Sequence, residues 1–401
     1  MKQLEAKLHP AAFAMLAIII VALLIPSAFI LRSNEDNLAT YHRRALVPAP
    51  DVSTLLEQPK DYFTALQAWH ADRIGFGVRA GLLYRRISYF LFAEAAVKTV
   101  ERSKGGFVFL VSHGQGARMS SVADSCPERA DWPEISKQIV NDWSAILAAF
   151  DARKTVPTLL IMPSKKTLYA ENLPKSVPRD LRLRCQNIRD DGNPVVHLAR
   201  DFEHSVIDAY PILAPFKNAP HFYPPENFHS DGESAMRAVS TALDVMGYPV
   251  SRDSVLEQFE PVRALADLIG VLGFQRQIFL NEPAGFDKTK LERDAEYTEF
   301  IAAKFGKGTY ARRYQNEDAP HKRSVLLITN SFGIRVAPYF ASAFESVDLI
   351  STNQLNTVEA RMHLFEEIVF GQAHDEIVFI FHDEAVFNGR LGNYATALAR
   401  L

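Results

Sequence analysis

The strongest chemical signal in the sequence is a serine at the start of a helix. The segment Leu327–Gly333 (Leu-Ile-Thr-Asn-Ser-Phe-Gly) has the pattern of a buried strand that ends in a sharp turn and leads into a helix over Ile334–Phe344. Such a turn exposes the Ser331 hydroxyl at the carboxyl edge of a sheet, where amides and the helix dipole stabilise a developing oxyanion. A helix-capping serine has the same local pattern, so the turn alone is compatible with both roles.

A nucleophilic serine needs a base, and His229 is the best placed of the 12 histidines. It lies in a loop directly before a predicted helix over Glu233–Met246, whose first residues, Ser230–Glu233, fit a capping box. Loops that end at helix starts often hold the bases of α/β enzymes. Asn227 or Glu226 could orient the ring through its other nitrogen.

The elements that must position these residues alternate along the chain. An amphipathic helix is predicted over residues 135–150 and a helical region over residues 62–92. Short apolar runs suited to buried strands occur at Gly106–Val111, Thr158–Met162, Ser324–Thr329, Val347–Ile350 and Glu376–Phe381. Alternation of such runs with helices predicts an α/β fold with a mostly parallel sheet and helices on both faces. Sheets of this kind carry their chemistry where strands end and helices begin.

The N-terminal region has the pattern of a membrane anchor. No Asp, Glu, Lys or Arg lies between Lys7 and Arg32, and Ala11–Leu31 is about as long as the ~20 residues that cross a bilayer as a helix. This core is longer than that of a cleaved signal peptide. We therefore expect a cytoplasmic tail and transmembrane anchor over residues 1–32, a polar stalk over residues 33–60, and one catalytic domain over residues 61–401.

Composition excludes several other functions. The net charge of −3 gives no basis for binding nucleic acid. A P-loop, a dinucleotide-binding glycine motif and paired Cys/His metal spacings are missing from the sequence, so no cofactor and no metal is expected. If the C-terminal bulk is exported, Cys126 and Cys185 lie in an oxidising compartment. One intramolecular disulfide is then open to them, although the sequence does not give the distance between them.

The order of these motifs resembles the SGNH-hydrolase-like domain of the alginate O-acetyltransferase family (AlgX and AlgJ type). That family has an Asp-x-His loop and, later in the chain, a strand that ends in Gly-Asp-Ser-Phe, which Asn227–His229 and Thr329–Gly333 resemble. The serine comes last, as in a permuted, flavodoxin-like version of an SGNH hydrolase. Weaker similarities follow the same order, at Trp69–Phe76, Gly105–Leu110, Pro163–Tyr169 and Leu173–Pro174.

The resemblance implies an enzyme with a Ser331–His229 centre, and it also shows where this sequence departs from the pattern. Asn227 replaces the Asp that orients the base, and Asn330 replaces the Asp before the serine. An asparagine can accept the ring N–H but cannot stabilise an imidazolium by charge. Glu226 could supply the carboxylate instead.

The function implied is O-acetylation of a cell-envelope exopolysaccharide by an O-acyltransferase of the SGNH type. The alternatives are a carbohydrate acetyl-esterase and a catalytically impaired, polysaccharide-binding accessory protein. Lys165, Tyr169 and Arg335 are candidates for lining the substrate groove. The resemblance further implies a single-pass protein of the bacterial inner membrane with its C-terminal domain in the periplasm. Its partners would be a polysaccharide acceptor and a membrane-bound O-acyltransferase that delivers the acetyl group.

Overall fold

The computed structural model describes residues 46–401, apart from residues 74, 93, 96, 104, 114, 115, 250–257, 289, 290, 307 and 308. The predicted anchor over residues 11–31 and the first part of the predicted stalk lie outside the described residues. Within the described ranges, no helix is both long and apolar enough to cross a membrane. The chain divides into two compact units.

The first unit takes in the chain up to Ala96 together with Leu272–Phe274. Its helices are α3 (Ser53–Glu57), α4 (Pro59–Arg73) and α5 (Gly75–Leu91). The backbone N–H of Val47 donates a hydrogen bond to Asp72 Oδ2 at 2.8 Å, which ties the start of the described chain to the end of α4. Helices α4 and α5 occupy the region in which the sequence predicts helices.

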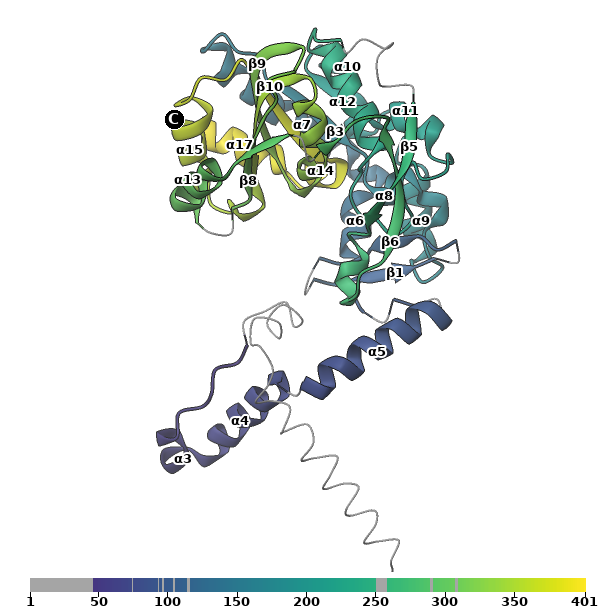
Figure 1. The fold of residues 1–401 in the computed structure, drawn as a ribbon, viewed down its shortest axis with the longest axis vertical. Coiled ribbons are helices and arrows are strands. Elements are labelled where there is room, and N and C mark those ends of the chain that lie inside the picture. The colour runs from purple at the N-terminus through teal and green to yellow at the C-terminus, as the bar shows by residue number, and fades with distance from the viewer. Residues whose placement is uncertain are drawn as a thin grey trace, which may run out of the picture. The chain divides into compact units, whose positions relative to one another are not determined.

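The second unit comprises Val97–Val271 and Gln275–Leu401 and is built on a seven-stranded sheet (Figure 1). The strand order is β4-β3-β11-β9-β10-β8-β7. The first five strands in this order are parallel; at one edge β8 pairs antiparallel with β10, and β7 pairs antiparallel with β8. The strands are β3 (Thr158–Met162), β4 (Val206–Asp208), β7 (Glu292–Asp294), β8 (Ala311–Gln315), β9 (His321–Thr329), β10 (Phe344–Ser351) and β11 (Glu376–His382).

Helices cover both faces of this sheet because its central strands are apolar on both sides. On one face, Leu327 and Ile380 pack with residues of α12 (Glu233–Val245) and α14 (Ser331–Ala341). On the other face, Ile328 and Phe379 pack with residues of α7 (Trp132–Asp151) and α17 (Arg390–Leu398). The predicted mostly parallel sheet between two helical layers is therefore confirmed.

The helices of the second unit are short, apart from α7 and α12. They are α6 (Ser120–Ser125), α7 (Trp132–Asp151), α8 (Lys165–Leu168), α9 (Arg179–Gln186), α10 (Pro194–Asp201), α11 (Tyr210–Leu213), α12 (Glu233–Val245), α13 (Ala295–Phe305), α14 (Ser331–Ala341), α15 (Val358–Leu364), α16 (Asp383–Phe387) and α17 (Arg390–Leu398). Two antiparallel pairs lie outside the main sheet, β1 (Val100–Arg102) with β2 (Val108–Leu110), and β5 (Phe259–Leu265) with β6 (Gln277–Pro283).

The connections identify the point at which the winding of the sheet reverses. From β9 the chain moves to β10 on one side and returns to β11 on the other side of β9. If the strands are counted from β9 and continued from β11 to β3 and β4, their order becomes 2-1-3-4-5, which is the flavodoxin order. In that order the switch point lies between β9 and β11. Ligands of doubly wound sheets bind at the carboxyl ends of the strands at this point.

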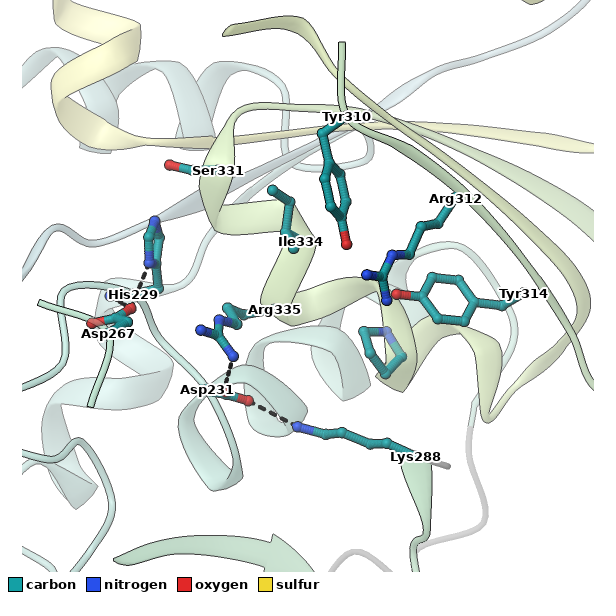
Figure 2. A pocket seen from close by; sticks show the side chains of 11 residues that line it. His229, Asp231, Asp267, Lys288, Tyr310, Arg312, Tyr314, Ser331, Ile334 and Arg335 are labelled. Atoms are coloured by element: carbon teal, nitrogen blue, oxygen red, sulfur yellow. Dashed lines mark hydrogen bonds and ion pairs between the residues drawn. The ribbon is translucent and has the colours of Figure 1, made fainter. Parts of the chain in front are cut away.

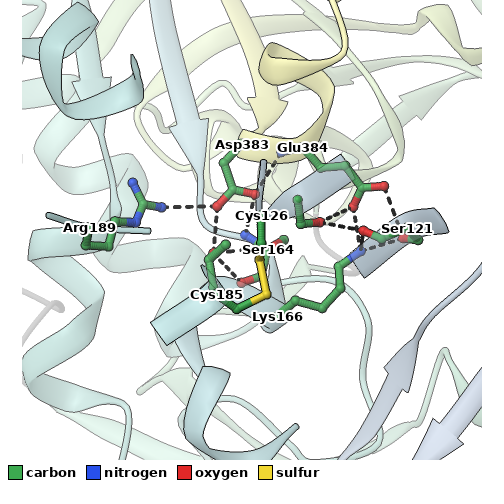
Figure 3. Close-up of a disulfide and its surroundings, with 10 residues drawn as sticks. Ser121, Cys126, Ser164, Lys166, Cys185, Arg189, Asp383 and Glu384 are labelled. Atoms are coloured by element: carbon green, nitrogen blue, oxygen red, sulfur yellow. Dashed lines mark hydrogen bonds and ion pairs between the residues drawn. A yellow bond between two sulfur atoms is a disulfide. The ribbon is translucent and has the colours of Figure 1, made fainter. Parts of the chain in front are cut away.

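A disulfide joins the segment before β3 to a segment after it. Cys126 follows α6, Cys185 lies in α9, and their Cα atoms are 5.0 Å apart (Figure 3). The sequence left this pairing open, and the structure forms it.

Candidate active site

Ser331 is the first residue of α14 and directly follows β9 through Asn330. The Asn330 side chain caps the helix, since its Oδ1 accepts a hydrogen bond from Phe332 N at 3.0 Å. The amides of a helix's first turn have no partner within the helix, so the Ser331 N–H is available to an anion. The predicted strand, turn and helix are thus present, with the helix starting at the serine itself.

Gly333 explains why the turn can be so tight. A Cβ on this residue would lie 2.0 Å from Thr329 Oγ1, far inside van der Waals contact. The Thr329 hydroxyl is held in place, because it lies 3.0 Å from the carbonyl oxygen of Ile380 on the neighbouring strand. A glycine two residues after the serine is therefore required for α14 to begin directly over the end of β9.

His229 is held by a carboxylate that the sequence analysis did not identify. Its Nδ1 lies 2.6 Å from Asp267 Oδ2. The same carboxylate accepts backbone N–H groups from Phe228 at 2.5 Å and from His229 at 3.1 Å. Burial works to raise the pKa of Asp267, but these hydrogen bonds outweigh it and hold the pKa below its usual value. Asp267 is therefore an anion that fixes the ring with its other nitrogen, Nε2, free.

Ser331 and His229 line one cavity of about 410 Å³. Figure 2 shows His229 between Asp267 and Ser331, with the ring nitrogen remote from Asp267 turned toward the serine. Among the described residues His229 Nε2 has no hydrogen-bond partner. The arrangement has the order of a nucleophile, a base and an orienting acid.

The predicted orienting residues have other partners. Asn227 Oδ1 accepts a hydrogen bond from the backbone N–H of Asp267 at 3.2 Å, so this residue positions the acid rather than the ring. Glu226 forms an ion pair with Arg276. The prediction that one of these two side chains holds the histidine is therefore corrected. Asp267 is 38 residues from His229 and is one of 47 acidic residues, and no local spacing distinguishes it.

The sequence also predicts a capping box at the start of α12, which the structure does not form. The residue that caps this helix is Gly232, with φ of 60° and no side-chain cap, while Ser230 Oγ donates to Ser234 Oγ at 2.7 Å. A Cβ on Gly232 would lie 2.4 Å from the carbonyl oxygen of Asn281. Close approach of the β6 backbone, and not capping chemistry, determines the residue at this position.

The rest of the cavity is basic and aromatic. Arg335 contributes a side chain 3.5 Å from Asp231, and Lys288 pairs with Asp231 at 2.9 Å and with Glu282 at 2.8 Å. Arg312 lies over the Tyr310 ring, and no carboxylate pairs with it within the described part of the chain. The full lining comprises His229, Asp231, Asp267, Lys288, Tyr310, Arg312, Tyr314, Ser331, Ile334, Arg335 and Pro338.

Of the three predicted groove residues, only Arg335 lines this cavity. Lys165 is 1% exposed, and its ammonium group donates to the carbonyl oxygens of Pro224, Pro225 and Asn227. Tyr169 is also buried, and its hydroxyl donates to a backbone carbonyl at 2.8 Å. Neither side chain lines this cavity: Lys165 supports the histidine loop, residues 224–229, from within the protein, and Tyr169 is held by the carbonyl oxygen of Lys217.

A second polar cluster lies beside the disulfide, after β3 and β11 (Figure 3). Lys166 and Glu384 are both buried and form an ion pair at 2.6 Å. Glu384 also lies 2.6 Å from His113 Nε2, which itself lies 3.3 Å from Asp124. His113, Asp124 and Glu384 could approach one metal ion, but Lys166 already compensates the charge of the carboxylate that would bind it.

Comparisons with known proteins give similarity in structure only. No protein-family model matches the chain. No curated protein matches its sequence. A DHHW family protein from Eubacterium siraeum is 11% identical and has a TM-score of 0.44, with 74% of this chain and 93% of that chain covered. PatB1 of Bacillus cereus is 12% identical with a TM-score of 0.40, over 63% of this chain and 91% of its own.

The O-acetyltransferase domain of Pseudomonas putida AlgJ is 14% identical with a TM-score of 0.42, over 72% of this chain and 92% of its own. Each of these proteins is one to which the chain is similar. AlgJ is of the type that the sequence motifs resemble, the SGNH-hydrolase-like domain of the alginate O-acetyltransferase proteins.

Proposed function

We propose that this chain is an O-acyltransferase that moves an acetyl group onto a hydroxyl of a cell-envelope polysaccharide. The observation that carries the proposal is the arrangement of Ser331 and His229 in one cavity, with Nδ1 of the histidine on Asp267 and Nε2 without a partner among the described residues. A histidine held on one ring nitrogen by a carboxylate, with the other nitrogen open to the serine, is the arrangement of the Ser-His-Asp triad.

In the first half of the reaction Ser331 Oγ attacks the carbonyl carbon of an acyl donor. The hydroxyl proton passes to His229 Nε2, and Asp267 stabilises the imidazolium that forms. The carbonyl oxygen becomes an oxyanion next to the amide at the start of α14. Collapse of this intermediate expels the donor's leaving group, which takes the proton from His229.

In the second half the acyl-enzyme is attacked by an acceptor hydroxyl. His229 removes the hydroxyl proton and returns it to Ser331 Oγ as the ester forms on the acceptor. Tyr310, Tyr314 and Arg312, which has no carboxylate partner among the described residues, give the cavity an aromatic and basic lining that suits a carbohydrate acceptor. Resemblance of the motifs to alginate O-acetyltransferases supports acetyl as the group transferred.

The proposal includes the setting in which the reaction occurs. The apolar stretch Ala11–Leu31 would anchor the chain in the bacterial inner membrane, with the domain in the periplasm. Cytoplasmic acetyl donors do not reach that compartment, so a membrane-bound O-acyltransferase would deliver the acetyl group.

Turnover of a chromogenic acetyl ester by the full chain in detergent tests the proposed centre. We expect Ser331→Ala and His229→Ala to lose activity, and the matched control His204→Ala to keep it, since His204 is a surface residue with a side chain 94% exposed. Activity equal to wild type in Ser331→Ala would reject Ser331 as the nucleophile.

Acceptor choice separates transfer from hydrolysis. With a deacetylated oligosaccharide added, a transferase forms acetylated sugar, measured by mass spectrometry, at the expense of free acetate. If the added oligosaccharide does not lower the amount of acetate released, the protein is an acetyl-esterase. Retained polysaccharide binding without any Ser331-dependent turnover would identify an accessory protein.

A further inference from the structure

His382 ends β11 at the switch point of the sheet, beside the strand that carries the nucleophile. Strands β9 and β11 are parallel neighbours, and their last paired residues are Thr329 and Ile380. Directly after this pair, the Asn330 N–H donates a hydrogen bond to the carbonyl oxygen of Ile380 at 3.4 Å. Ser331 and His382 each lie two residues beyond that last pair, so both are at the same edge of the sheet and on adjacent strands.

The His382 side chain also lies on the face of the sheet that carries the catalytic groups. Side chains alternate along a strand, and Ile380 packs in the core under α12 and α14. The His382 ring centroid is 4.8 Å from that of Phe332 and 6.5 Å from that of Phe228. The His229 ring contacts the same two phenylalanines, with centroids at 5.0 Å and 4.8 Å. Two imidazoles therefore flank one pair of aromatic rings next to Ser331.

A helix cap determines which nitrogen of His382 carries the proton. Nδ1 accepts a hydrogen bond from Ala385 N at 3.2 Å and so caps α16. An accepting nitrogen has no proton, so the neutral ring carries its proton on Nε2. Burial, reinforced by the positive charges of Lys166 and His229, lowers the pKa of His382 to about 4, against the opposing effect of Glu384 and Asp383. The ring is therefore neutral at physiological pH.

Nothing in the described part of the chain uses the remaining N–H. Nε2 has no hydrogen-bond partner there, and the side chain is half-buried. A neutral imidazole kept uncharged at a helix N-terminus is an established way to polarise a carbonyl, because it donates a hydrogen bond without giving up its proton. The catalytic scheme above leaves His382 without a role.

We propose that His382 is a catalytic residue that donates its Nε2–H to the oxyanion formed when Ser331 attacks an acyl group. This inference rests on the proposed acyl transfer. As the Oγ–carbon bond forms, the π electrons of the carbonyl move to its oxygen, and the serine proton goes to His229. His382 transfers no proton and forms no bond to carbon; its hydrogen bond shortens as negative charge develops and relaxes when the leaving group departs.

Two substitutions separate the donor from the cap. His382→Asn keeps an acceptor near the position of Nδ1, so it caps α16, but it has no donor where Nε2 lies. His382→Gln places an N–H near the position of Nε2. We expect His382→Asn to lower kcat for an acetyl ester by about 10²–10³ with little change in KM. His382→Gln should recover part of that loss, and His204→Asn at the exposed control position should match wild type.

The outcomes distinguish this inference from the proposed function. Ser331-dependent turnover that is unchanged in His382→Asn overturns the role of His382 alone. Equal losses in His382→Asn and His382→Gln, with a parallel drop in unfolding free energy, also overturn it, since they show a structural role. Wild-type protein without any Ser331-dependent turnover overturns both proposals.

A measurement that needs no turnover tests the tautomer directly. With histidine-selective ¹⁵N labelling, the resonances of His382 are those that disappear in His382→Asn. We expect the neutral, Nε2-protonated form throughout the neutral pH range. An Nδ1-protonated ring, or an imidazolium at pH 7, overturns the inference.

Discussion

Asp267 gives His229 the negative charge that an asparagine at position 227 does not provide. The carboxylate reaches Nδ1 at 2.6 Å from a loop that follows β5, while Asn227 supports that loop through the backbone N–H of Asp267. The sequence therefore departs from an Asp-x-His motif without losing the carboxylate contact. In the proposed mechanism, the base would receive its orienting acid from a segment distant in the chain.

Replacing Asp267 by Asn should lower kcat strongly and change stability less. The amide can still accept the ring N–H, but it cannot stabilise the imidazolium by charge, which in a serine protease costs about 10⁴ in kcat. Steady-state kinetics on an acetyl ester measure the change, with the exposed Asp151→Asn as matched control. If Asp267→Asn stays near wild type while Asn227→Ala loses activity, the orienting group is Asn227 and our assignment is wrong.

Lys165 stabilises the histidine loop from beneath. Its ammonium group donates to three backbone carbonyls of residues 224–227, and burial lowers the pKa of Lys165 to about 7. In the unfolded chain the pKa returns to its ordinary value of 10.5. Between about pH 7 and pH 10 the unfolded state therefore binds a proton that the folded state lacks.

The sign of the pH effect follows from this difference. Stability rises with pH wherever the unfolded state binds more protons. We expect the unfolding free energy of wild type to gain more between pH 7 and pH 9.5 than that of Lys165→Met, in denaturant titrations at both values. The exposed Lys137→Met should keep the wild-type slope. Equal pH slopes in wild type and Lys165→Met would contradict the shifted pKa.

Individual residues differed in how far the sequence could identify them. Ser331 and His229 follow strong local patterns, a strand–turn–helix and a loop before a helix. Arg335 lies one helical turn after the serine, so it shares the exposed surface of the same helix. The partners of Asp267 and Lys165 lie far away in the sequence and meet them only in the folded chain. No local pattern therefore separates these two residues from other charged residues.

At the scale of elements, the turn between β9 and α14 determines where the proposed nucleophile, Ser331, lies. Buried side chains fix the end of β9, the Asn330 side chain starts the helix, and Gly333 allows the helix to pass close to Thr329. Each of these features acts within five residues of Ser331. The serine is therefore positioned by local packing at the sheet edge.

Adding one methyl group to this turn should impair it. In Gly333→Ala the new Cβ would lie 2.0 Å from Thr329 Oγ1, so the first turn of α14 must shift and move Ser331 with it. We expect an unfolding free energy lower by about 1–3 kcal/mol, as for other overpacked sites, together with a larger loss in kcat.

Gly270→Ala is the matched control for this test, because a Cβ there meets no atom within 4 Å. Thermal unfolding and ester turnover of both variants measure the effects. Wild-type kcat in Gly333→Ala would show that the close contact does not position the nucleophile.

Elements were predictable from sequence where burial on both faces leaves a continuous apolar run. Four such runs are β3, β9, β10 and β11, the core of the parallel sheet. The β5–β6 hairpin was missed because every side chain along β5 is exposed or half-buried, which gives no buried apolar run. Asp267 lies in the connection between β5 and β6, so the hairpin and the acid were missed for the same physical reason.

At the scale of the whole molecule, the disulfide ties the end of α6 to α9. Cys126 and Cys185 are separated by 59 residues, and the loop they close contains all of α7 and β3. Both cysteines are buried. The bond therefore restricts the unfolded chain over a long segment while remaining inaccessible in the folded one.

Removing the bond should cost stability and leave the chemistry unchanged. For a loop of this length the chain-entropy estimate is about 4 kcal/mol. We expect the double variant Cys126→Ser, Cys185→Ser to unfold at lower denaturant and, where folded, to retain wild-type kcat. An unfolding free energy equal to that of oxidised wild type would contradict the structural role of the bond.

The position of β11 in the sheet has a consequence for how the protein is made. This strand lies between β3 and β9, so without it the sheet consists of two separate pieces, β4-β3 and β9-β10-β8-β7. Within the described part of the chain, β11 is also the last strand in sequence order, and it ends at His382. The two pieces therefore cannot join into one sheet until residues 376–382 have been synthesised and have left the ribosome, and until then the proposed site at the end of β9 lacks its neighbouring strand.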